Sequence, residues 1–187
     1  MGRQEQTNHL FSNRDLRILL VPLIVEQILN SLMGTADSIM VSNVGSAAIS
    51  AVSLVDSINI LVIQAFYALA AGGTIVCSQY IGQKDKKNAE ESARQLSFVV
   101  ACISSAVMAV CLLTRGPLLR LIFGSVEADV MEAAQTYFFY TALSFPFIAL
   151  YDAGSSIYRA QGNTRLPMTI AVVSNGLNIA GNAVLIW

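Results

Sequence analysis

The chain has 187 residues, of which 55% are hydrophobic and 12% are charged, and its formal net charge at pH 7 is −1. A soluble domain carries roughly 25% charged residues, so this composition, with a mean hydropathy of +0.59, excludes an ordinary soluble protein and indicates a membrane protein. The small net charge, without a basic patch or a run of like charges, excludes nucleic acid as a partner.

Five apolar segments are long enough to cross a bilayer, which requires about 20 mostly apolar residues. We therefore expect an all-α membrane protein with a polar N-terminal arm at residues 1–15. The first apolar segment is too long for a cleavable signal peptide and is expected to remain as a signal anchor. The predicted transmembrane helices are residues 16–40, 47–80, 95–114, 130–158 and 167–187.

The distribution of Lys and Arg predicts the orientation, because short cytoplasmic loops carry an excess of basic residues. With five helices, the N-terminal arm and the second and fourth connections share one side, and nine of the eleven basic residues fall there. We therefore predict a multi-pass protein of the plasma membrane with a cytoplasmic N-terminus. The main cytoplasmic loop is expected at residues 82–95, and residues 116–133 are expected to connect helices on the outside.

Two carboxylates interrupt the first apolar segment, where each charge costs about 2.5–3.5 kcal/mol on translocon scales. Glu26 and Asp37 are eleven residues apart, so a helix places them on one face, with Asn30 close to it. Pro22 lies one turn before Glu26 and is expected to bend the helix, since proline frees a carbonyl group. Contacts between helices are an alternative explanation for Glu26, whereas Asp37 is the stronger functional candidate.

Polar side chains recur in the other apolar segments, where they are expected to face a bundle or a cavity. Glu26, Asn30, Asp56 and Tyr140 are predicted to line a substrate cavity, although Asp56 would also suit a packing hydrogen bond between helices. Asp152 lies near Arg159 and could simply be hydrated or paired. The recurring residues are Asp56 and Asn59 in the second segment, Tyr137, Tyr140, Ser144, Tyr151 and Asp152 in the fourth, and Asn175, Asn178 and Asn182 on one side of the fifth.

A buried carboxylate becomes tolerable when it is protonated or when it binds a cation. Both cases describe ion coupling, because a carboxylate that alternates between the bound and the free state changes which conformation of the bundle is favoured. The sequence therefore predicts an antiporter with a sodium ion or a proton as coupling ion and with no other cofactor.

Four stretches, taken in order, resemble the N-terminal lobe of the multidrug and toxic-compound extrusion (MATE) transporters: PLIVEQILNSLMGTADSIMVSNVG, GGTIVCSQYIGQKD, YDAGSSIYRAQGNTRLPM and SNGLNIAGNAVLIW. The resemblance implies a transporter of twelve helices in two six-helix lobes. Residues 16–187 would supply helices one to five of the first lobe, without the sixth helix and the C-terminal lobe. It also implies efflux of drug-like or organic cationic compounds by antiport with alternating access.

The resemblance further implies which residues bind the coupling cation. Asp37 in ADSIMV matches the aspartate of the first helix, and Asn178 and Asn182 map onto an N-x-x-x-D pattern in the fifth. Asn182 replaces the usual carboxylate there, while Asp152 stands where an asparagine is usual. We therefore hypothesise that the two positions have exchanged their carboxylate. Pro22 matches the bending proline of the first helix.

Other classes of membrane protein fit the sequence less well. An intramembrane hydrolase needs a nucleophile with a base, or clustered metal ligands, but His9 is the sole histidine and GxSxG and HExxH motifs are absent. No enzyme is therefore expected. A flippase of lipid-linked precursors and a non-transporting membrane scaffold remain as alternatives. The expected partners are membrane lipid, a small-molecule substrate and the missing C-terminal lobe.

Overall fold

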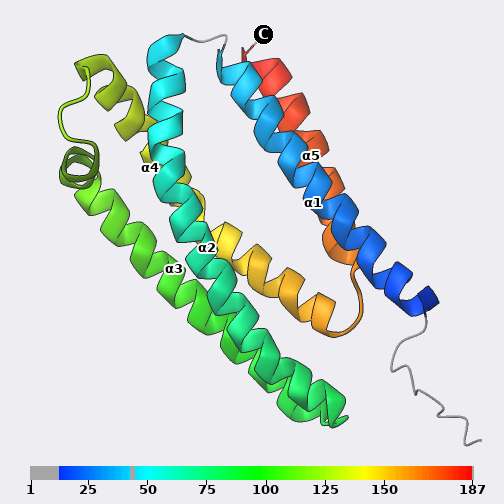
Figure 1. Cartoon of the computed structure of the whole chain (residues 1–187). Helices are drawn as coiled ribbons and strands as arrows, with labels where there is room; N and C mark the ends of the chain where they lie inside the picture. Colours follow the sequence, from blue (N-terminus) through cyan, green and yellow to red (C-terminus); the bar gives the residue numbers. More distant parts are fainter. Residues whose placement is uncertain (1–12, 43–44, 187) are drawn as a thin grey trace, which may run out of the picture.

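The computed structural model describes residues 13–42 and 45–186, which form five α-helices and no strand (Figure 1). Within the helices, the side chains of residues 13, 15, 36–38, 40–42 and 182–186 lie outside the described part. The predicted all-α fold and the order of its helices are confirmed. The helices are α1 (Asn13–Ser42), α2 (Ser46–Gly82), α3 (Lys86–Phe123), α4 (Ala128–Ala160) and α5 (Arg165–Ile186).

α3 is much longer than the helix predicted at residues 95–114, so the long loops predicted on both sides of it are wrong. Most of the predicted cytoplasmic loop forms the first turns of α3, where Asp85 Oδ1 accepts a hydrogen bond from the Asn88 amide at 3.2 Å. An exposed ion pair between Lys86 and Glu90, at 3.7 Å, supports the same turns. Hydropathy marks only the apolar part of a helix, so it does not detect polar turns that extend beyond the bilayer.

The helices alternate in direction (Figure 1). The start of α1 and the connections at residues 83–85 and 161–164 lie toward one end of the molecule, and the ends of α1 and α5 lie at the other. The predicted orientation depends on this arrangement, because it assumed that the N-terminal arm and the second and fourth connections share one side. Within the described residues, α1, α2 and α3 are long and apolar enough to cross a membrane. α4 is also long enough, but tyrosines and Asp152 interrupt its apolar run.

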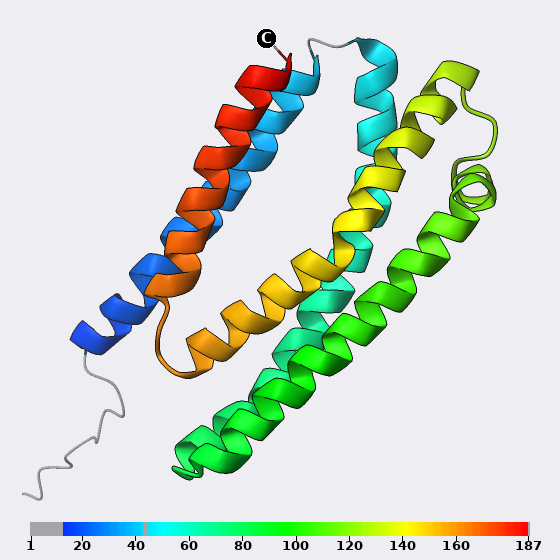
Figure 2. The same ribbon diagram turned by 180° about the vertical axis from the view of Figure 1, so that it is seen from behind.

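α2, α3 and α4 pack together around a shared hydrophobic core (Figures 1 and 2). The core includes an edge-to-face contact between Phe66 of α2 and Phe145 of α4, with ring centroids 6.0 Å apart. α1 packs mainly along α5, and this pair contacts α2 and α4 at only a few positions. The fold therefore consists of a three-helix group and a helix pair, with limited contact between them.

Gly73 is a point of close approach between α2 and α3, because a Cβ atom there would overlap the side chain of Leu96. A Cβ atom at the neighbouring Gly72 would meet open space. Gly72→Ala should raise the free energy of unfolding by about 0.5–1 kcal/mol, through better helix propensity. Gly73→Ala brings the same gain in helix propensity, but its Cβ atom displaces Leu96. The net effect should be a free energy of unfolding lower by about 1–3 kcal/mol.

The measurement is unfolding in detergent, followed by circular dichroism, with the two alanine variants compared side by side. Equal stability of the two variants would contradict the close α2–α3 contact.

Candidate functional site

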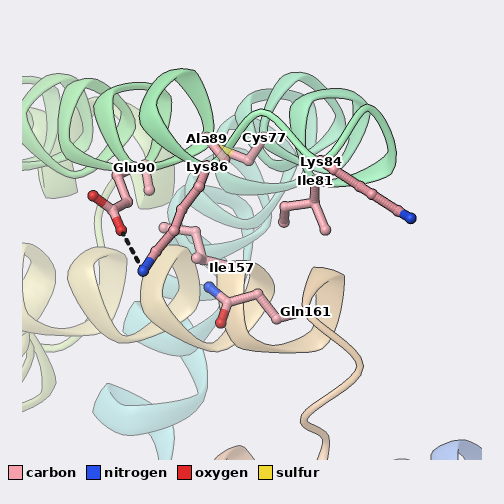
Figure 3. Close-up of a pocket in the computed structure, with 9 residues that line it drawn as sticks. Cys77, Ile81, Lys84, Lys86, Ala89, Glu90, Ile157 and Gln161 are labelled. Carbon is pink, nitrogen blue, oxygen red and sulfur yellow. Dashed lines mark ion pairs between the residues drawn. The ribbon is translucent and has the colours of Figure 1, made fainter.

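A cavity of about 290 Å³ lies where the ends of α2 and α4 meet the start of α3 (Figure 3). Cys77 and Ile81 of α2 and Gln161 after α4 line it, and the Lys86–Glu90 ion pair stands beside them. None of the residues predicted for the substrate cavity or the cation site lines this cavity. The site predicted from the sequence must therefore be sought among the polar side chains between the helices.

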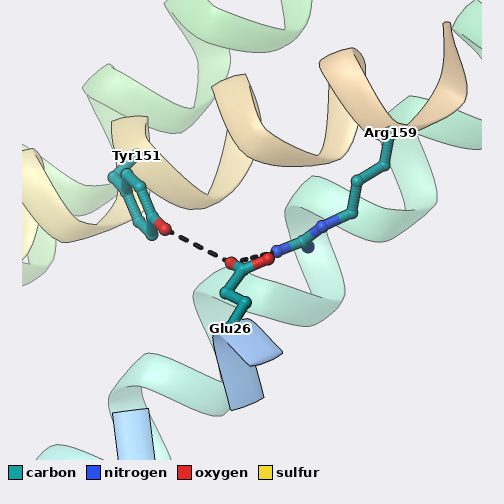
Figure 4. Close-up of polar contacts among 3 residues, drawn as sticks. All are labelled: Glu26, Tyr151 and Arg159. Carbon is teal, nitrogen blue, oxygen red and sulfur yellow. Dashed lines mark hydrogen bonds and ion pairs between the residues drawn. The ribbon is translucent and has the colours of Figure 1, made fainter. Parts of the chain in front are cut away.

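One polar cluster joins α1 to α4 (Figure 4). Arg159 Nη2 donates to Glu26 Oε1 at 2.6 Å in a salt bridge, and the Tyr151 hydroxyl donates to the same oxygen at 3.3 Å. Glu26 is only 4% exposed. A charge-assisted hydrogen bond of this length in a buried setting is among the stronger polar contacts in proteins. Glu26 therefore links the helix pair to the three-helix group.

The cluster retains unused hydrogen-bonding capacity. Glu26 Oε2, Arg159 Nε and Asp152 Oδ2 are all buried and have no hydrogen-bond partner within the described residues. Asp152 lies two turns before Arg159 on α4, close enough to interact with the charges of both Arg159 and Glu26. Buried polar atoms are normally paired, so these three atoms are exceptions to the usual pairing.

A second cluster joins α2 to α4 about Asp56. Asp56 Oδ1 accepts hydrogen bonds from Asn59 Nδ2 at 3.3 Å and from the Tyr137 hydroxyl at 3.1 Å. This is the packing contact that the sequence left open as an alternative for Asp56. Tyr140 is 66% exposed and lines a shallow pocket with Tyr137 and Glu132 on one face of α4.

The remaining predicted residues lie on α1 and α5, which run side by side (Figures 1 and 2). Asp37 falls within the last two turns of α1, and Asn182 falls within the last two turns of α5, at the end of the molecule where the two helices finish together. The side chains of both lie outside the described residues, so their contact stays a prediction.

Three asparagines of these helices have described side chains, and one of them, Asn178, is half-buried on α5. Asn175 is buried and donates to the Ala171 carbonyl at 2.8 Å, within its own helix. Asn30 is exposed on α1.

The structure thus separates the predicted residues into groups. Asp152 lies near Glu26 and Arg159, whereas Asp56 of α2 contacts Tyr137 on an earlier turn of α4. The exchange of a carboxylate between Asp152 and Asn182 stays a hypothesis, because the Asn182 side chain is not described. Among the described residues, no group of three or more His, Cys, Asp or Glu could hold a metal ion.

Sequence reasoning missed Arg159 as the partner of Glu26. It counted Arg159 among the cytoplasmic basic residues and weighed it as a neighbour of Asp152. The available signal was a buried carboxylate in one span and a basic residue at the end of another, but many such pairs exist in a membrane protein. Thr164, which donates to the Ile18 carbonyl at 3.4 Å, was also missed.

The Asp56 cluster gives a test of the packing between α2 and α4. Tyr137→Phe removes one hydrogen bond to Asp56 and should lower the free energy of unfolding by about 1 kcal/mol. The loss should be larger when the Asp56 carboxyl group is ionised, because hydrogen bonds to charged groups are stronger. Tyr140→Phe is the matched control, because its exposed side chain makes surface contacts and should change stability by less than about 0.5 kcal/mol. Denaturation in detergent measures both. Equal effects of the two substitutions would contradict a stabilising role for the Tyr137 hydroxyl.

Comparison with known proteins gives the family of the chain. The sequence model of the MatE family matches residues 22–184. The chain is 33% identical over 183 residues to the uncharacterized transporter YisQ of Bacillus subtilis, covering 98% of this chain and 38% of that protein. It is 26% identical over 169 residues to the probable multidrug resistance protein NorM of Thermotoga maritima, covering 89% of this chain and 35% of that protein. The chain therefore spans well under half the length of these relatives.

Solved structures show the same fold. A MOP superfamily transporter from Pyrococcus furiosus superposes with a TM-score of 0.86 at 22% identity, over 92% of this chain and 38% of that chain. A crystal structure of MATE in the bent conformation has a TM-score of 0.81 at 22% identity, over 92% of this chain and 39% of that chain. The resemblance inferred from the sequence is thereby confirmed: this multi-pass membrane chain belongs to the MatE family of transporters.

Proposed function

We propose that this chain is part of a secondary active transporter that exports drug-like or organic cationic compounds by sodium- or proton-coupled antiport with alternating access. The observation that carries the proposal is the match of residues 22–184 to a transporter family whose relatives include multidrug resistance proteins such as NorM of Thermotoga maritima and PmpM of Pseudomonas aeruginosa. The chain spans 38% of YisQ and 35% of NorM. The activity would therefore belong to a longer assembly with a C-terminal lobe.

Asp37 is proposed as the residue that binds and releases the coupling cation, with Asn178 and Asn182 as oxygen donors and Asp152 as a further carboxylate. Carboxylate and amide oxygens are hard ligands that suit a small cation. The side-by-side course of α1 and α5, and their common end, support the grouping of Asp37 with Asn178 and Asn182, whereas Asp152 lies on α4 near Glu26. Binding of a cation by Asp37 would remove an uncompensated charge from the bilayer and so change which conformation is favoured.

Glu26, Asn30, Asp56 and Tyr140 are proposed to line the path of the substrate. Carboxylates and an exposed tyrosine ring attract organic cations through charge and through cation–π interactions. Glu26 and Asp56 are engaged with Arg159 and Tyr137 in this structure, so a substrate would have to compete for them.

Pro22 is proposed as the point at which α1 bends during transport. Solved MATE structures include one described as straight and one described as bent. Pro22 is buried and lies within α1, where a proline interrupts the helical hydrogen bonds. The N-terminus is proposed to be cytoplasmic and the membrane to be the plasma membrane. The connections at 83–85 and 161–164, which the basic residues surround, lie toward the same end as the start of α1.

The test is efflux of a cationic dye from cells that express the complete gene encoding this chain, under an imposed sodium or proton gradient. Asp37→Asn keeps the shape of the side chain but removes the titratable charge, so it should reduce coupled efflux to the background of cells without the gene. Glu91→Gln is the control, because Glu91 is exposed on α3 and its ion pair with Arg94 is a surface contact. Unchanged efflux in Asp37→Asn at equal expression would contradict the coupling role.

A further inference from the structure

Pro22 leaves one carbonyl of α1 without its helical partner. Proline has no amide hydrogen, so the carbonyl of Ile18, four residues earlier, receives no hydrogen bond from within the helix. In a bilayer, such a group has to be satisfied by a neighbouring element. The site of bending in α1 therefore depends on what lies beside it.

Thr164 supplies that partner. Its side chain is buried at 3% exposure, and its hydroxyl donates to the Ile18 carbonyl at 3.4 Å, a long hydrogen bond. A threonine directly before a helix commonly accepts a hydrogen bond from the helix start. At the start of α5, Asn163 Oδ1 accepts from the Leu166 amide at 3.3 Å instead, so the Thr164 hydroxyl remains available to α1.

Arg159 holds α1 on the other side of the proline. It binds Glu26, one turn after Pro22, whereas Thr164 binds Ile18, one turn before it. Arg159 and Thr164 flank one tight turn. This turn is closed by a 2.9 Å hydrogen bond from the Gly162 amide to the Arg159 carbonyl, and Gly162 has a φ of 78°, which glycine adopts without strain.

We propose that the α4–α5 turn, residues 159–164, is a clamp on the proline bend of α1, in which Arg159 and Thr164 are positioning residues that set the inclination of α1. Apart from the contacts of this turn, α1 packs mainly along α5 and touches α2 at only a few positions, so the turn that joins α5 to α4 sets the angle of α1 to the three-helix group. The role of the clamp in transport rests on the proposed function, but the position of α1 is measurable without transport.

Thr164 and Arg159 depend on Pro22 in different ways. If residue 22 were alanine, its amide would satisfy the Ile18 carbonyl within the helix, and the Thr164 hydroxyl would become redundant there. The Glu26–Arg159 contact would persist, because it does not involve a backbone group of the bend. A double substitution can therefore separate a clamp on the proline from a general effect on packing.

The experiment measures distances between spin labels in the full gene product in lipid nanodiscs, by pulsed electron paramagnetic resonance. Labels at the exposed positions Arg17 on α1 and Lys87 on α3 report the angle of α1, after the native cysteines are replaced. Thr164→Val removes the hydroxyl with little change of shape and should shift or broaden the distance distribution. The same substitution in a Pro22→Ala background should leave the distribution of that background unchanged.

The matched control is Thr169→Val, because the Thr169 hydroxyl is exposed and donates to the Arg165 carbonyl within α5, at 2.9 Å. It should leave the distribution unchanged. For the ion pair, Arg159→Met alone would strand a buried carboxylate and endanger folding. The double variant Glu26→Gln with Arg159→Gln removes both charges instead and should also shift the distribution, while circular dichroism shows an unchanged helical content.

Unmoved distances in both Thr164→Val and the double glutamine variant would overturn the clamp. An equal shift by Thr164→Val with and without Pro22 would overturn the part assigned to the Ile18 carbonyl. Neither outcome depends on efflux. Conversely, normal efflux in Asp37→Asn would contradict the proposed function and leave the distances, and so the clamp, intact.

Discussion

The high free energy of an unpaired charge in an apolar bundle is the constraint on which this arrangement depends. Glu26 directly follows the apolar run of residues 18–25 in α1, and removing one partner from a buried ion pair typically costs about 3–5 kcal/mol. The carboxylate therefore determines where the end of α4 must lie, because Arg159 has to reach it. The turn into α5 follows, and with it the start of the helix that packs along α1. One buried charge thus relates the two groups of helices.

The same constraint gives the polar contacts a directional role that apolar packing lacks. The core of α2, α3 and α4 is formed by aliphatic and aromatic side chains such as Phe66 and Phe145, and such contacts tolerate small sliding movements. Hydrogen bonds to Glu26 and to the Ile18 carbonyl specify particular atoms on particular turns. A transporter needs helices that move between a few defined positions, and contacts of this kind define positions while they remain breakable.

The sequence predicted those features that depend on local composition. Five apolar runs gave the number and order of the helices, and the spacing of Glu26 and Pro22 gave a polar position next to a bend. The length of α3 could not be obtained in this way, since its first turns are polar and are held by the Asp85 cap and by pairs such as Lys86–Glu90. Nor could the partner of Glu26, because the choice of Arg159 depends on how α4 crosses the bundle. The contacts of Asp37 and Asn182 remain predictions.

The 133 residues that separate Glu26 from Arg159 in the chain have a consequence for biosynthesis. Membrane proteins enter the bilayer as they are translated, so α1 is made long before the end of α4. At about 5–20 residues per second, the interval is on the order of ten seconds. During this time the Glu26 carboxyl has to be hydrated, protonated or held by the insertion machinery. The late synthesis of Arg159 thus sets the earliest moment at which Glu26 can form its ion pair with α4.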